Sequence, residues 1–152
     1  MSTPAFVYVT YIAATIDEVW QRITDGEFTK KYFFGRIVKS DWKEGSRVAY
    51  LLEDGGLDVS GKILKIERNR LLSFTWEGAA DDTPRETPYV VTFDLKPQSG
   101  AVKLTLRHEN LLPVDYVEAD DTFAGLNNGW PAILSNLKSL LETGKTMPAI
   151  SV

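Results

Sequence analysis

The chain has 152 residues and no cysteine, and its 43% hydrophobic and 25% charged residues are typical of one globular domain. Its 17 Lys and Arg against 21 Asp and Glu give a net charge of −4, which argues against nucleic-acid and anionic-membrane partners. The absence of cysteine excludes disulfides, thiolate metal sites and cysteine nucleophiles. The N-terminus does not resemble a signal peptide, and no apolar run reaches membrane-spanning length, so the expected location is the cytoplasm.

The first part of the chain predicts a strand followed by two helices. Residues 5–14 are β-branched and aromatic, which favours a strand. Residues 15–24 predict an amphipathic helix, because Thr15 and Glu18 form a capping-box pattern ahead of an apolar face. A short second helix is expected over residues 26–33, with Asp25 as its N-cap and Gly35 after its end.

The remainder predicts antiparallel strands and one long helix. Alternating apolar residues indicate strands at 47–52, 59–67, 71–77, 89–95 and 101–109. An interruption of this alternation predicts a β-bulge near Leu64. A helix is expected over residues 122–143, with Gly144 after its last turn. Pro131 either kinks this helix or marks a separate helix that begins at Trp130.

These elements define an α+β helix-grip fold, in which a curved antiparallel sheet wraps around the long C-terminal helix. Each of the later strands has one apolar face, and the last helix is the only element long enough to cover that face. We predict a single domain over residues 1–152, with an ordered core of about 5–144 and a frayed tail at 145–152.

Four stretches carry a family resemblance. They are "YIAATIDEVWQRITDGEFTKKYFFG" (11–35), "LLSFTW" (71–76), "LTLRHENL" (104–111) and "GWPAILSNLKSLLETG" (129–144). In this order they resemble the SRPBCC (START-like, Bet v 1-like) superfamily, and within it the subgroup of homologues of the activator of heat-shock protein 90 ATPase. The resemblance implies the helix-grip fold and a cavity of the kind that polyketide cyclases, lipid carriers and hormone receptors use. It also implies a heat-shock ATPase as a candidate partner.

His108, the only histidine, shares the inward face of its strand with Leu104 and Leu106. One interpretation is a core or rim histidine that is hydrogen-bonded to its neighbours. The other is a ligand anchor or general base, because the unperturbed pKa of histidine lies near neutrality. His108 is therefore the only catalytic candidate, and the sequence offers no carboxylate that would orient it.

Aromatic residues recur on the faces that should point inward. They are interpreted either as ordinary core or as the wall of a ligand cavity, and both interpretations stay open. Asn127 is expected to cap or break the helix before Pro131, with a ligand hydrogen bond as the minor alternative. The candidate cavity residues are Tyr32, Phe34, Tyr50, Trp76, Tyr89, Phe93, His108, Phe123, Asn127, Trp130 and Leu134.

No catalytic, metal-binding or cofactor motif is found. One histidine and no cysteine argue against a zinc site, and the acidic run from Asp115 to Asp121 is typical of a solvated loop. The favoured function is therefore non-catalytic binding of a small apolar molecule, which could be aromatic, polyketide-like or a lipid. The alternative is a cyclase-like acid/base enzyme that uses His108 and a tyrosine. A co-chaperone ranks third, and the sequence leaves a homodimer open.

Overall fold

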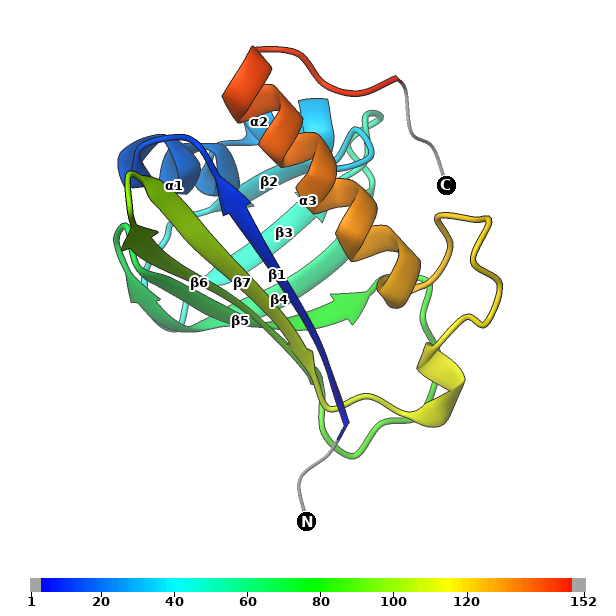
Figure 1. Cartoon of the computed structure of the whole chain (residues 1–152). Helices are drawn as coiled ribbons and strands as arrows, with labels where there is room; N and C mark the ends of the chain where they lie inside the picture. Colours follow the sequence, from blue (N-terminus) through cyan, green and yellow to red (C-terminus); the bar gives the residue numbers. More distant parts are fainter. Residues whose placement is uncertain (1–3, 149–152) are drawn as a thin grey trace.

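The computed structural model describes residues 4–148, which form a curved antiparallel sheet with a long helix lying across it (Figure 1). The strands are β1 (Ala5–Ile12), β2 (Ile37–Ser40), β3 (Arg47–Leu51), β4 (Leu57–Glu67), β5 (Leu71–Gly78), β6 (Tyr89–Gln98) and β7 (Ala101–Glu109). The helices are α1 (Ile16–Thr24), α2 (Gly26–Tyr32), the short 3-10 turn η1 (Pro113–Asp115) and α3 (Leu126–Thr143). The strand order β1-β7-β6-β5-β4-β3-β2 confirms the helix-grip prediction.

The first two helices begin where local side-chain chemistry places them. The Thr15 hydroxyl accepts a hydrogen bond from the Glu18 backbone N–H, and the Glu18 carboxylate accepts one from the Thr15 N–H. Asp25 ends α1 and caps α2 by accepting a hydrogen bond from the Glu27 N–H. Each cap satisfies backbone donors that a helix start otherwise leaves unpaired, so both predicted N-termini are confirmed.

The core lies between the sheet and α3. Every second residue of β7 is buried, from Val102 through to His108, as the alternation predicts. The covering helix contributes Leu134 and Leu137, whose side chains are 1% and 0% exposed. Burial of an apolar side chain of this size stabilises a fold by about 1.5–3 kcal/mol. The packing of α3 against the sheet therefore contributes a large part of the free energy of unfolding.

The structure differs from the sequence predictions at β2 and in the last helix. The strand β2 was not predicted, because its four residues are too few to show a period. The last helix begins at Leu126 and not at residue 122, because its N-cap Gly125 has a φ of +86°, outside the helical region. Pro131 lies inside a continuous α3, so the interpretation of a separate helix starting at Trp130 is wrong.

Beyond Gly144 the chain has no further helix or strand up to residue 148. Four hydrogen bonds join this segment to α3. Met147 N–H donates to the Asn136 side chain at 2.8 Å, and Lys145 N–H donates to Thr143 Oγ1 at 3.1 Å. The Lys145 carbonyl accepts from the hydroxyls of Ser139 at 2.8 Å and Thr143 at 3.1 Å. The predicted fraying of residues 145–152 therefore has little support at 145–148. Residues 149–152 lie outside the described residues.

The strand β4 contains a bulge and a close backbone contact. Its pairing with β5 shifts register between Ile63 and Lys65, which confirms the bulge predicted near Leu64. A short distance before it, a Cβ atom added to Gly61 would lie 1.6 Å from the carbonyl oxygen of Thr75. Only glycine fits at such a distance, because the obstacle is backbone and cannot rotate away.

We expect Gly61→Ala to lower the free energy of unfolding by about 2 kcal/mol or more, since the new methyl group must push β4 and β5 apart. Urea denaturation followed by circular dichroism measures the change. The control is Ser60→Ala at the preceding residue, expected to change the stability by less than about 0.5 kcal/mol. Equal stabilities of the Gly61→Ala variant and the parent chain would contradict the predicted contact.

Candidate functional site

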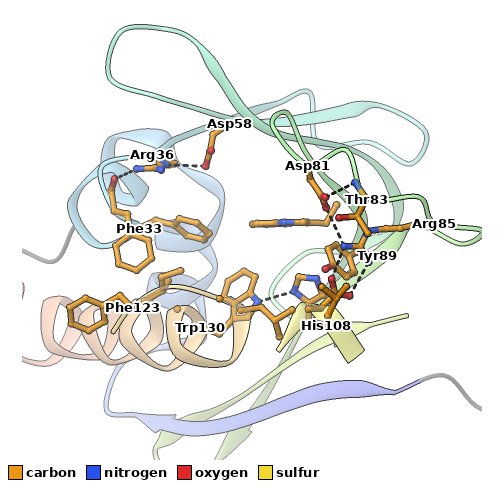
Figure 2. Close-up of a pocket in the computed structure, with 18 residues that line it drawn as sticks. Phe33, Arg36, Asp58, Asp81, Thr83, Arg85, Tyr89, His108, Phe123 and Trp130 are labelled. Carbon is orange, nitrogen blue, oxygen red and sulfur yellow. Dashed lines mark hydrogen bonds and ion pairs between the residues drawn. The ribbon is translucent and has the colours of Figure 1, made fainter. Parts of the chain in front are cut away.

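A pocket of about 440 Å³ lies between the sheet and the first half of α3. This volume is within the range of small-molecule sites in proteins. Figure 2 shows the lining side chains converging on it from α3, the sheet and the surrounding loops. They are Phe33, Phe34, Arg36, Asp58, Trp76, Asp81, Thr83, Arg85, Tyr89, His108, Val114, Asp115, Phe123, Gly125, Leu126, Gly129, Trp130 and Ile133.

The inner wall of the pocket is a cluster of rings. The ring centroids of Trp76 on β5 and Trp130 on α3 lie 5.3 Å apart. Phe33, which follows α2, meets Trp130 edge to face at 5.6 Å. These separations are those of favourable aromatic pairs, so the cluster forms a packed apolar floor. It joins β5, α3 and the segment after α2.

His108 is buried in this wall and is held by Trp130. The indole Nε1–H of Trp130 donates a hydrogen bond of 2.9 Å to His108 Nδ1 (Figure 2). The imidazole is 2% exposed, and its Nε2 atom is buried with no hydrogen-bond partner among the described residues. Burial lowers the pKa of His108 to about 4, with Asp115 opposing the shift and Arg85 adding to it. His108 is therefore neutral near pH 7.

One side of the pocket mouth is a charged cluster centred on Arg85. Its guanidinium donates two hydrogen bonds to Asp115, at 2.7 and 2.8 Å, and a third to Asp81 at 3.2 Å. The same guanidinium lies 4.0 Å from the centroid of the Tyr89 ring. The hydrogen bonds from Arg85 lower the pKa of Asp115 to about 2. The cluster joins the loop after β5 to the η1 turn, which follows β7.

A second ion pair lies on the opposite side of the mouth. Arg36 Nε donates to Asp58 at 3.0 Å, and its Nη1 donates to the carbonyl oxygen of Phe34 at 2.7 Å. Both charged side chains are partly exposed, so the pair contributes at most about 1 kcal/mol to stability. Both arginines that line the pocket thus have carboxylate partners.

Six of the candidate cavity residues line this pocket: Phe34, Trp76, Tyr89, His108, Phe123 and Trp130. Four others lie in the packed core beside it. The Tyr50 ring stacks on Phe33 with centroids 4.8 Å apart and is 2% exposed, and the Tyr32 hydroxyl donates to the Arg22 carbonyl at 2.8 Å. Phe93 and Leu134 are buried with them in the hydrophobic core.

Asn127 does not line the pocket, although it lies in the first turn of α3. Its side chain accepts a hydrogen bond from the Val117 N–H at 3.1 Å and donates one to the Val117 carbonyl at 2.9 Å. Both polar atoms of the amide are therefore used to attach the loop before α3 to the helix. The side chain does not cap the helix.

The charged residues of the mouth were not among the sequence candidates. Asp115 belongs to the acidic run interpreted as a solvated loop, yet its side chain is only 5% exposed because Arg85 covers it. Arg85 lies 30 residues away, in a loop without periodicity, so no local pattern joins the two. A Pro at the first position of η1, with Asp115 three residues after Leu112, is the one local sign of an ordered turn.

Among residues 4–148, no helix is long and apolar enough to cross a membrane. The same part of the chain contains no group of three or more histidine, cysteine or carboxylate side chains that could hold a metal ion.

A curved antiparallel sheet that grips a C-terminal helix, with a ring-lined pocket between them, defines a protein of the SRPBCC fold. The sequence profile described as "Activator of Hsp90 ATPase homolog 1-like protein" matches residues 13–142. The chain belongs to this family, as the four motifs indicate. No match was found among curated proteins.

Solved structures repeat the fold at low sequence identity. Protein MLL2253 from Mesorhizobium loti has a TM-score of 0.74 at 24% identity, over 91% of this chain and 97% of its own. CalU16 from Micromonospora echinospora has a TM-score of 0.70 at 24% identity, over 92% and 77%. The Aha1 dimer from Colwellia psychrerythraea has a TM-score of 0.70 at 21% identity, over 93% and 98%.

The environment of His108 predicts a pH dependence of stability. Its pKa is about 4 in the folded chain and close to 6.5 when unfolded, so the unfolded chain binds more protons between these values. We expect about 3 kcal/mol of stability to be lost as the pH falls from 6.5 to 4. Urea denaturation across this range measures the loss.

His108→Gln removes the only histidine and is expected to flatten this part of the pH profile. Glu118→Gln, at an exposed residue of the loop before α3, is the control and should leave the profile unchanged. An unaltered slope in His108→Gln would show that other groups cause the pH dependence.

Proposed function

We propose that this protein binds a small, largely apolar aromatic molecule in the pocket between the sheet and α3, without catalysing a reaction. The observation that carries the proposal is the pocket itself: about 440 Å³, with six phenylalanine, tyrosine and tryptophan rings in its lining. Rings provide a large apolar surface at little cost in side-chain entropy, and they suit flat, apolar ligands. The family and its fold are consistent with such a cavity.

The alternative of an acid/base enzyme has less support. A general base needs a free lone pair, and the Nδ1 lone pair of His108 is occupied by the Trp130 N–H. No hydrogen bond joins His108 to a tyrosine among the described residues, and Tyr50 does not line the pocket. Tyr89 meets the imidazole through its ring, at a centroid distance of 4.3 Å and an angle of 86°. Binding without turnover accounts for this arrangement more simply.

A chaperone partner remains the third proposal and rests on the family name alone. A related structure is described as an Aha1 dimer, which makes a homodimer of this chain a further proposal. Co-precipitation with the heat-shock ATPase of the host tests the first, and sedimentation equilibrium tests the second. Neither proposal depends on the pocket, so their outcomes are independent of ligand binding.

Native mass spectrometry of protein purified from its host tests the main proposal, together with thermal shifts produced by naphthalene and fluorene. A bound mass, or a rise in melting temperature that saturates with probe concentration, is expected. A protein without bound ligand that also shows no shift with either probe would overturn the proposal.

Filling the pocket from α3 should weaken binding without unfolding the chain. Gly129 lines the pocket, and a Cβ added to it would lie 3.5 Å from the Phe123 carbonyl and 3.9 Å from the Phe34 ring, which are ordinary contacts. We expect Gly129→Ala to fold and to be stabilised by up to about 1 kcal/mol, because glycine disfavours helix interiors.

The longer side chain of Gly129→Leu projects toward the pocket and is expected to weaken fluorene binding at least tenfold relative to Gly129→Ala. Isothermal titration calorimetry on both variants measures the difference. Equal affinities of the alanine and leucine variants would place the fluorene site elsewhere.

A further inference from the structure

The hydrogen bond between Trp130 and His108 determines which imidazole nitrogen carries the proton. An indole N–H can only donate, so His108 Nδ1 must be the acceptor and must be unprotonated. In the neutral imidazole the single proton is then on Nε2. The distance of 2.9 Å is that of an ordinary N–H···N hydrogen bond, and both side chains are at least 97% buried, which protects it from competing water.

The Nε2–H is a hydrogen-bond donor without an acceptor. Within the described residues Nε2 has no partner, while the imidazole lines the pocket together with Tyr89 and Trp76. Leaving a buried donor unpaired costs about 1–3 kcal/mol. A ligand that places an acceptor oxygen against this nitrogen would remove that cost. To reach the atom, the ligand must displace the surrounding rings slightly, as side chains commonly allow on binding.

The charges around the pocket indicate a ligand without a net charge. Arg36 is paired with Asp58, and Arg85 is paired with both Asp115 and Asp81. The lining contains these two arginines and three aspartates, so it is negative by one charge while His108 is neutral. A carboxylate or phosphate ligand would face this excess or would have to break an existing ion pair, and either change costs free energy.

We propose that the pocket selects uncharged, flat aromatic ligands that carry a carbonyl oxygen, and that this oxygen accepts a hydrogen bond from His108 Nε2–H. Trp130 acts as the positioning residue, since it holds the imidazole in the tautomer that keeps its proton on Nε2. This inference rests on the proposed binding function and names the ligand class of the same site.

Fluorene and 9-fluorenone provide a matched pair of probes, because they differ only by a methylene group in place of the carbonyl. Calorimetric titrations give the ratio of their dissociation constants in the parent chain and in His108→Phe. We expect the preference for fluorenone to fall at least about tenfold in the variant, in which the buried carbonyl loses its donor. An unchanged preference would overturn the inference while leaving the binding function intact.

Failure of both probes to bind the parent chain would overturn the binding proposal together with the inference. The probe 9-fluorenone-2-carboxylate tests the charge argument and is expected to bind at least about tenfold more weakly than fluorenone. Tighter binding of this carboxylate would contradict an uncharged ligand.

Nitrogen-15 NMR of the single histidine gives a readout that does not depend on a variant folding. It is expected to show a protonated Nε2 and an unprotonated Nδ1. The Nε2–H signal should shift with fluorenone much more than with fluorene. The opposite tautomer, or equal shifts with both probes, would overturn the role of His108.

Discussion

The contact between Trp130 and His108 is the physical link on which the site depends. It joins α3 to β7, two elements that share no local pattern in the sequence, by one hydrogen bond inside an apolar cluster. Water competes little with a buried hydrogen bond of this kind. Loss of either side chain would leave the other with a buried polar group that has no hydrogen-bond partner. The pair therefore holds α3 against β7 beside the pocket, which both residues line.

The rest of the pocket is arranged around that link in two chemically different layers. Aromatic rings form the inner wall, where Trp76 and Phe33 contact Trp130. Ion pairs form the mouth, where Arg85 holds Asp115 from a neighbouring loop. An apolar interior with paired charges at its entrance favours ligands that bring rings inward and have no charge of their own to satisfy.

Much of the fold could be predicted because its signals are local. The capping box of Thr15 and Glu18, the alternation along β7 and the irregular spacing near Leu64 each determine backbone geometry within a few residues. Local signals were insufficient for β2, which is too short to show a period, and for residues 122–125, where the φ of Gly125 makes α3 begin later than the apolar pattern suggests.

The sequence by itself determined the order of the longer elements, the inward face of each long strand and the inward position of His108. Alternation and capping are properties of neighbouring residues, so no tertiary contact was needed. Only the tertiary structure decided which inward rings meet a cavity and which are packed: Trp76 lines the pocket, whereas Tyr50, also inward, stacks on Phe33 and Phe74. It also decided that Asp115 is an ion-pair partner of Arg85 rather than solvated, because the contact that buries it comes from a loop distant in the chain.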